Sequence, residues 1–366
     1  MITAEVRRAI WDSARDAAAD GELPPITQKA DTSSLRPVPD KRPGRYASTL
    51  PYQLAGHTPP NRIAATLAAR LRGLPWIAEA EAAPQGYLTL SVTEDALAAL
   101  AVRITEAGPA ACARSDILRG TMRLAARRLE PAELATAASW ADARDRLAAE
   151  VSAELARAAG AKIVQEFSSE RLPAKVSPAR KPDPRIADAL AFAGSDVVRY
   201  ALLRMTPGVP AESTAAGRRF AAGVEGGVRN HLDNPVYAVR YAHAHAASTL
   251  RQAADLGIVA GEAVEFRPRL LAHTAERALL GALSWLPERV AGAARRGQPR
   301  ELARYLEELA GAYHDDRENC PALPFGGRGA PRDGGTMDAR LWLVSAARTA
   351  IAAGLALLGV SAPDRL

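Results

Sequence analysis

Cysteine is scarce in this sequence of 366 residues, which contains only Cys112 and Cys320. The two lie far apart along the chain and neither belongs to a Cys-x-x-Cys pair, which argues against a disulfide framework and against a structural zinc site. We therefore expect no bound metal. A reducing, cytoplasmic location fits this cysteine usage.

Long apolar runs are also missing. The longest apolar stretch, 341–360, is interrupted by Arg348 and also carries Ser345 and Gly354. A membrane-spanning helix needs about 20 consecutive, mostly apolar residues, so we expect a buried amphipathic helix here. Charges are scattered through residues 1–17, which have no apolar core like that of a signal peptide. The sequence therefore predicts a soluble protein with no membrane partner.

Lysine is scarce as well. Only five of the 47 basic residues are lysines, so 42 are arginines, and the formal net charge is +6. A guanidinium group binds phosphate through two parallel hydrogen bonds, and basic charge favours a polyanionic partner. A coding bias toward GC-rich codons, which the many alanines also indicate, is the more common cause of such an arginine count. The composition therefore supports a nucleic-acid partner without establishing one.

The length and composition fit two or three globular domains. With 48% hydrophobic and 24% charged residues, the chain is too apolar for general disorder. Residues 1–118 are predicted to form a small α/β domain, and residues 187–366 an all-helical domain, because apolar residues recur there at helical spacing. The expected helices are 2–19, 61–71, 94–106, 141–159, 274–286, 300–313 and 337–358, and the expected strands are 86–92 and 162–167.

The most informative segment is 234–252. Asn234 is a suitable N-cap, and Pro235 occupies the first helical position, where a missing backbone N–H costs nothing. Apolar residues line one face of the helix and Arg240 lies off it. The segment begins Asn-Pro-Val-Tyr-Ala-Val-Arg-Tyr-Ala-His-Ala-His. It resembles the first long helix of the anticodon-binding domain of arginyl-tRNA synthetases, in which the position of His245 is usually an arginine.

Four further motifs carry the same resemblance. Residues 194–204 resemble the start of that domain, and 357–366 resemble the end of these synthetases, so the last residues are expected to pack back on the helical bundle. Residues 44–54 and 85–90 resemble two motifs of the N-terminal appended domain. The resemblance implies an α+β, mainly α fold, in which a small α/β appended domain (1–118) and a helical bundle of the class Ia synthetase anticodon-binding type (187–366) flank a collapsed catalytic remnant or linker (119–186).

The appended domain of this family contacts the elbow of tRNA. In this sequence Arg45 replaces an acidic residue of the family motif, and Thr49 replaces an asparagine. The change to arginine favours contact with a phosphate backbone, and a solvated loop arginine is the alternative. The resemblance thus points to Arg42, Arg45 and Tyr46 as residues that face the tRNA elbow.

A second expected RNA surface serves the anticodon arm. The segment 313–321 corresponds to a family motif close to the anticodon, but here it carries Asp316 and Glu318, whose charges repel phosphates, so anticodon reading is expected to be altered or lost. For Tyr237 and Tyr241 the alternative is a place in the hydrophobic core, which is the more common role of such tyrosines. The residues assigned to the anticodon arm are Asn234, Tyr237, Arg240, Tyr241, His245, Arg251, Arg317 and Arg328.

The two ATP-binding signatures of a class I synthetase are degenerate in this sequence. No histidine occurs at 58–230, and alignment with the family places Ser139 and Asp142 where two phosphate-binding histidines are expected. The second signature falls on Lys175 and Pro178, where proline replaces a lysine. The short segment that remains cannot build a nucleotide-binding fold from one βα unit.

These features predict a catalytically inactive, synthetase-like protein, or pseudoenzyme, that needs no cofactor. We expect it to bind tRNA, with tRNA(Arg) or arginyl-tRNA as the first candidate, and to hold it or deliver it to another enzyme. Two alternatives stay open. One is an interaction module that docks on a synthetase or biosynthetic enzyme without binding RNA, and the other is residual arginine–tRNA ligase activity completed by a partner.

Overall fold

The chain divides into two compact units, each assembled from separate stretches of sequence. The computed structural model describes residues 2–26, 35–38, 42–123, 129–164, 181–205, 232, 234–258, 266–324 and 333–366. Unit 1 contains residues 1–108, 249–288 and 312–347, and unit 2 contains residues 109–248, 289–311 and 348–366. The described residues are mainly helical, with small sheets, which confirms the expected fold class. The three continuous domains expected from the sequence, with boundaries at 118 and 186, stay a prediction.

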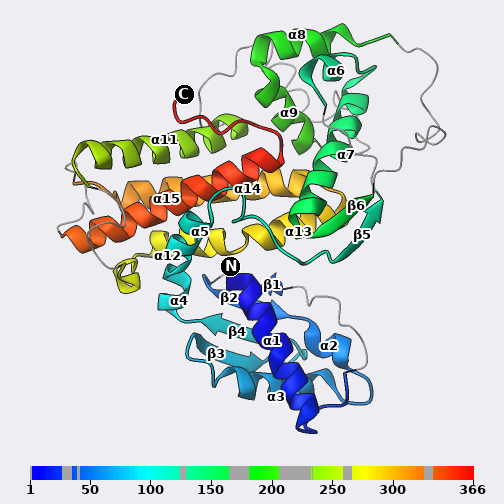
Figure 1. The fold of residues 1–366 in the computed structure, drawn as a ribbon, viewed down its shortest axis with the longest axis vertical. Helices are drawn as coiled ribbons and strands as arrows, with labels where there is room; N and C mark the ends of the chain where they lie inside the picture. The colour runs from blue at the N-terminus through cyan, green and yellow to red at the C-terminus, as the bar shows by residue number, and fades with distance from the viewer. Residues whose placement is uncertain are drawn as a thin grey trace. The chain divides into compact units, whose positions relative to one another are not determined.

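Unit 1 contains a four-stranded antiparallel sheet in the order β1-β2-β4-β3 (Figure 1). Every second residue of β4 is buried, which confirms the strand that alternation predicts there. The strand begins two residues later than expected, because Gly86 has a positive φ of 85° and belongs to the preceding turn. The strands are β1 (Leu35–Pro37), β2 (Arg45–Ser48), β3 (Ile77–Ala82) and β4 (Leu88–Val92).

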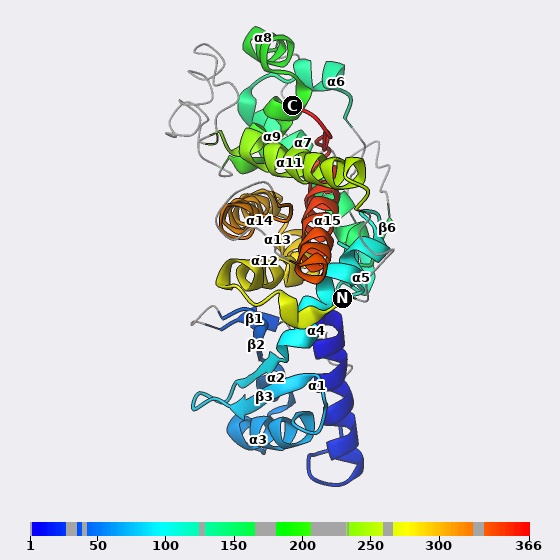
Figure 2. The same cartoon turned by 90° about the vertical axis from the view of Figure 1, so that its left-hand side faces the viewer.

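The helices of unit 1 begin with α1 (Ile2–Ala19), which buries Ile2, Val6 and Ile10 on one face and packs against α3 (Figure 2). The helix expected at 94–106 is divided at Ala99, where α4 ends and α5 begins. The Thr93 hydroxyl caps α4 by accepting the Ala96 N–H at 3.2 Å. The remaining elements of unit 1 are α2 (Leu50–Leu54), α3 (Pro60–Leu71), α4 (Glu94–Ala98), α5 (Leu100–Ala107), the 3₁₀ helix η1 (Pro268–Leu270) and α12 (Thr274–Ser284).

Unit 2 is mainly helical and includes a two-stranded parallel sheet, β5 (Gly120–Arg123) with β6 (Ala161–Val164). The helix expected at 141–159 is α7, and the strand expected after it is β6 as far as the described residues extend. Four long helices, α11, α13, α14 and α15, contribute residues to both units. The helices are α6 (Pro131–Ala135), α7 (Trp140–Ala158), α8 (Pro184–Ala193), α9 (Ser195–Arg204), α11 (Pro235–Asp255), α13 (Leu286–Arg296), α14 (Arg300–Asn319) and α15 (Gly334–Leu357).

The helix α15 carries most of the apolar stretch noted in the sequence. Among the described residues it is the one helix long and apolar enough, by length and composition, to cross a membrane. Buried residues make up 56% of its apolar window, as in the core helix of a globular protein. Leu341, Leu343 and Ile351 are among the residues that it buries completely. This burial agrees with the amphipathic core helix expected there.

Candidate nucleic-acid interface

Three rings form a row along α11. The carbonyl of Asn234 accepts the Ala238 N–H at 2.9 Å, as expected of the residue that begins the helix. One turn apart, the Tyr237 and Tyr241 rings stack with their centroids 5.6 Å apart and their planes 18° apart. The His245 ring follows, 6.0 Å from that of Tyr241. All three residues are half-buried, so each ring packs on the protein and keeps part of its surface accessible.

This aromatic row can accept nucleic-acid bases. Each base has a flat π face, and stacking on a protein ring contributes about 1–3 kcal/mol per base. The four-residue spacing keeps the rings of Tyr237, Tyr241 and His245 on one side of the helix. The opposite side is anchored by Val236, Val239 and other buried residues, so the row has a fixed support.

His243 lies off the aromatic row, in the interior of unit 2. It is 3% exposed, and its Nδ1 lies 2.9 Å from the carbonyl oxygen of Pro363. Burial lowers the pKa of His243, so the ring is neutral at pH 7. Because a carbonyl can only accept, Nδ1 carries the proton and donates. The contact ties α11 to the end of the chain.

The last residues pack back on unit 2, as the sequence predicts. Besides the bond to Pro363, the Asp364 carboxylate pairs with Arg348 at 2.9 Å. The Ser361 hydroxyl donates to Asp196 and accepts from Arg240 at 3.3 Å. Arg240 also pairs with Asp196 at 3.5 Å, and 21% of its side chain is exposed. Its guanidinium group is therefore engaged within the protein, and its assignment to the anticodon arm stays a prediction.

The acidic segment near the end of α14 differs from the sequence-based expectation. Asp316 is 3% exposed and lies in unit 1 near Glu276 and Arg340. Burial raises the pKa of Asp316 to about 8, so its carboxyl group is protonated at pH 7 and carries little charge. The expectation that Asp316 repels phosphates beside an RNA pocket is therefore wrong. Glu318 is exposed and retains that capacity.

Two more residues assigned to the anticodon arm are described. Arg317 lies 3.9 Å from Glu318, and 22% of its side chain is exposed. Arg251, near the end of α11, is half-buried. Neither residue has a geometry that singles it out for RNA, so their role stays a prediction. Arg328 lies outside the described residues.

The three residues expected at the tRNA elbow have different environments. Arg42 is exposed, and Arg45 lies 4.0 Å from Glu81 with 20% of its side chain exposed. Tyr46 is fully buried, and its ring packs on that of Trp285 with centroids 5.2 Å apart. Burial also raises the pKa of its hydroxyl. The expectation that Tyr46 faces tRNA is wrong, because alternation along β2 directs Tyr46 to the covered face of the sheet and Arg45 to the other.

A different aromatic pair lies on unit 1, with one exposed and one half-buried ring. Tyr52 of α2 is 43% exposed, and its ring lies 5.1 Å from that of Tyr87. Gly86, next to Tyr87, lies close to the start of α3, because a Cβ there would lie only 2.9 Å from a Pro60 carbon. This pair is not among the residues expected to bind RNA. No local pattern reveals it, since the two tyrosines are on separate elements.

The N-terminus of α7 carries the two residues aligned with phosphate-binding histidines. The Ser139 hydroxyl accepts the Asp142 N–H at 3.2 Å, and the Asp142 carboxylate accepts the Ala138 N–H at 2.9 Å. Asp142 also pairs with Arg146 at 2.7 Å. The helix end is therefore capped by its own side chains, and an incoming phosphate would meet a carboxylate. Lys175 and Pro178, from the second signature, lie outside the described residues.

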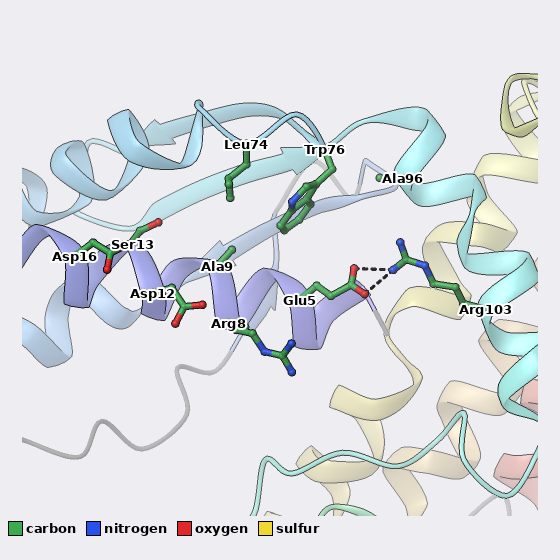
Figure 3. A pocket seen from close by; sticks show the side chains of 10 residues that line it. All are labelled: Glu5, Arg8, Ala9, Asp12, Ser13, Asp16, Leu74, Trp76, Ala96 and Arg103. Carbon is green, nitrogen blue, oxygen red and sulfur yellow. Dashed lines mark hydrogen bonds and ion pairs between the residues drawn. The ribbon is translucent and has the colours of Figure 1, made fainter.

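A cavity of about 480 Å³ lies on unit 1 between α1 and the segment that leads into β3 (Figure 3). Trp76 points toward α1, and Arg103 closes one end through hydrogen bonds of 2.6 and 2.7 Å to Glu5. Asp12 and Asp16 also line it, which disfavours a phosphate-bearing nucleotide. Among the described residues, no group of three or more histidine, cysteine or acidic side chains is arranged to hold a metal ion.

A known protein family matches the C-terminal region of the chain, which includes Tyr241 and His245 of the aromatic row. Residues 239–366 match the family model of the DALR anticodon binding domain. The match covers the C-terminal third of the chain. The chain is 39% identical to the arginine–tRNA ligase of Clavibacter sepedonicus over 181 residues and to that of Frankia alni over 180 residues. Each match covers 49% of this chain and 30% of the ligase, so the chain spans less than a third of these relatives.

The fold also resembles that of a solved synthetase. The Thermus thermophilus arginyl-tRNA synthetase superposes with a TM-score of 0.57 and 16% sequence identity, over 98% of this chain and 100% of that chain. At this identity the likeness concerns the fold alone. It agrees with the resemblance drawn from the motifs, and the DALR domain provides the closer functional clue.

Proposed function

We propose that this protein binds tRNA, with tRNA(Arg) as its preferred partner, and holds it or delivers it to another enzyme without aminoacylating it. The observation that carries the proposal is the half-buried row of Tyr237, Tyr241 and His245 on α11. The last two of these residues lie in the range that matches the DALR anticodon binding domain. A row of rings that keeps part of its surface accessible suits stacking with unpaired bases, such as those of an anticodon loop.

The capped end of α7 supports a role without catalysis. Ser139 and Asp142 satisfy the backbone donors that a phosphate would need, and Asp142 adds a negative charge beside them. A nucleoside triphosphate would have to break these hydrogen bonds. We therefore expect no arginine-dependent exchange of pyrophosphate into ATP, and such exchange by the purified protein would contradict this part of the proposal.

A competition binding assay tests the proposed function. The protein is titrated with labelled tRNA(Arg) against unlabelled tRNA(Arg), tRNA(Arg) with a changed anticodon, and an unrelated tRNA, at two salt concentrations. Preference for tRNA(Arg) over both competitors is the expected result. Equal and steeply salt-dependent binding of all three would mean that only nonspecific phosphate contacts are made. No binding would overturn the proposal and favour an interaction module that docks on an enzyme.

A further inference from the structure

The turn between α13 and α14 concentrates positive charge. Residues 295–304 read Arg-Arg-Gly-Gln-Pro-Arg-Glu-Leu-Ala-Arg, so four arginines accompany a single glutamate. These residues belong to unit 2, as does the aromatic row of α11. None of the four arginines is among the residues that the resemblance assigned to RNA. We call Arg295, Arg300 and Arg304 the arginine turn.

Backbone hydrogen bonds hold this turn in one conformation. Gly297 has a positive φ of 60°, and its N–H bonds the carbonyl of Ala294 at 3.1 Å. The N–H of Gln298 bonds the carbonyl of Ala293 at 2.9 Å, which completes a Schellman motif at the end of α13. The Glu301 N–H then bonds the carbonyl of Gln298 at 3.0 Å and starts α14. The arginines are therefore displayed from a fixed backbone.

The only acid in the ten residues pairs with Arg296. Arg296 Nε lies 2.8 and 2.9 Å from the two carboxylate oxygens of Glu301. Arg300 bonds the neutral carboxamide of Gln298 at 3.2 and 3.3 Å. Arg295 and Arg304 are exposed and form no ion pair with any residue that the structure describes. At least two guanidinium groups are thus presented to solvent without an acidic partner in the described part of the chain.

This arrangement opposes two general preferences of helices. Cations near a helix N-terminus are disfavoured by about 0.3–1 kcal/mol. Arg300 and Arg304 are also like charges four residues apart, which costs a further few tenths of a kcal/mol. A bound polyanion would offset both of these unfavourable energies. Guanidinium groups pair with phosphate oxygens in a bidentate manner.

We propose that the arginine turn binds the phosphate backbone of RNA, as a contact separate from the aromatic row. The inference rests on the proposed function and deepens it: the row of α11 receives bases, and the turn of α13 and α14 receives phosphates. Phosphate contacts position an RNA without reading its sequence, whereas base contacts discriminate. The two surfaces therefore affect binding in different, separable ways.

The test is the salt dependence of tRNA binding by the double variant Arg295→Gln, Arg304→Gln. Loss of about two phosphate contacts reduces the slope of log K against log salt by about 1.5, which is about 30-fold weaker binding at 0.1 M salt. Discrimination between tRNA(Arg) and its anticodon variant is expected to stay unchanged. The control is Arg114→Gln, Arg119→Gln, which removes two exposed arginines of unit 2, one of them paired with Asp116, and leaves the slope as in the wild type.

Four outcomes overturn the proposal. An unchanged slope in the double variant, with binding by the wild-type protein intact, refutes the arginine turn alone. An equal loss in the control refutes a localised contact. Absence of tRNA binding by the wild-type protein refutes the proposed function together with this inference. Vesicles with 30% phosphatidylserine serve as a second anion, and a loss of vesicle binding without a loss of tRNA binding would assign the turn to a membrane surface instead. Circular dichroism melting checks that every variant is folded.

Discussion

Arg199 and Glu150 form an ion pair of 2.8 Å in the interior of unit 2, where their side chains are 7% and 8% exposed. The second oxygen of Glu150 accepts the Leu129 N–H at 3.2 Å, and Arg199 donates to the Leu129 carbonyl at 3.3 Å. The pair joins α7, which lies in the expected remnant segment, to α9. Helix α7 is therefore part of the core of unit 2.

Breaking this pair should strongly destabilise the protein. Arg199→Met leaves the Glu150 carboxylate buried without its partner, and loss of one member of a buried pair costs about 3–5 kcal/mol. Adding Glu150→Met should recover most of the loss, because the uncompensated charge is gone. Urea unfolding measures both changes. The exposed pair Arg157–Glu154 provides the control, since Arg157→Met should cost less than about 1 kcal/mol. Similar losses at both sites would contradict this account.

Replacement of Gly359 should also destabilise the protein, because this residue packs against Arg199. Its φ is +67°, and a Cβ there would overlap the Arg199 guanidinium group, whose Cζ would lie at 3.1 Å. Gly359→Ala therefore combines backbone strain with a steric clash and should destabilise the protein by about 2–4 kcal/mol. Gly297→Ala is the matched control, with a φ of +60° and no neighbouring atom within 4 Å of the added Cβ, and strain alone should cost about 1 kcal/mol. Thermal unfolding compares the two, and equal losses would show that contact with Arg199 contributes nothing.

Local patterns in the sequence predict the helices and the central strand well. Alternation finds β4, and the Asn-Pro start finds α11, because both depend on neighbouring residues alone. The packing of the final residues was also predicted, from a motif. The predictions that are wrong concern the environment of single side chains, namely Tyr46 and Asp316. Tyr46 is covered by Trp285, and Asp316 is buried near Arg340 of another helix. Strand periodicity separates the two faces of a sheet, but it does not say which face distant residues cover.

In the candidate site, too, the local pattern could be predicted from the sequence but the environment of the side chains could not. Four-residue spacing places Tyr237, Tyr241 and His245 on one side of a helix, so the row follows from the sequence once the helix is assigned. Its partial exposure does not follow, because exposure depends on the other helices. The pair of Tyr52 and Tyr87 could not be predicted at all, since it needs the approach of a short helix to the turn at Gly86.

The buried Asp316 predicts a specific dependence of stability on pH. Its folded-state pKa of about 8 is well above that of an unfolded aspartate, so the folded state binds more protons between about pH 4 and pH 8. The contribution of this group to stability is therefore complete below pH 4 and falls as the pH rises, by up to about 1.4 kcal/mol per unit, until about pH 8. Asp316→Asn should remove this fall. Urea unfolding between pH 5 and pH 8 measures it, and parallel profiles for the two proteins would show that Asp316 is already ionised in the folded state.

The aromatic row predicts a loss of RNA binding with little loss of stability. Tyr241→Leu keeps an apolar side chain of moderate size on α11 but removes the central ring between Tyr237 and His245. Stacking of one base contributes about 1–3 kcal/mol, so affinity for tRNA(Arg) should fall about 5- to 150-fold. The slope against salt should stay the same, because no phosphate contact is removed. Fluorescence anisotropy with labelled tRNA(Arg) measures both quantities.

Tyr46→Leu is the control that separates recognition from folding. Tyr46 is fully buried against Trp285, so its replacement should lower the free energy of unfolding by about 1–3 kcal/mol and leave the affinity of the folded protein for tRNA(Arg) unchanged. Tyr241 is half-buried, and its replacement should do the reverse. If Tyr241→Leu instead destabilises the protein as much as Tyr46→Leu and binds tRNA(Arg) normally, the rings on α11 serve packing alone and the proposed recognition surface must lie elsewhere.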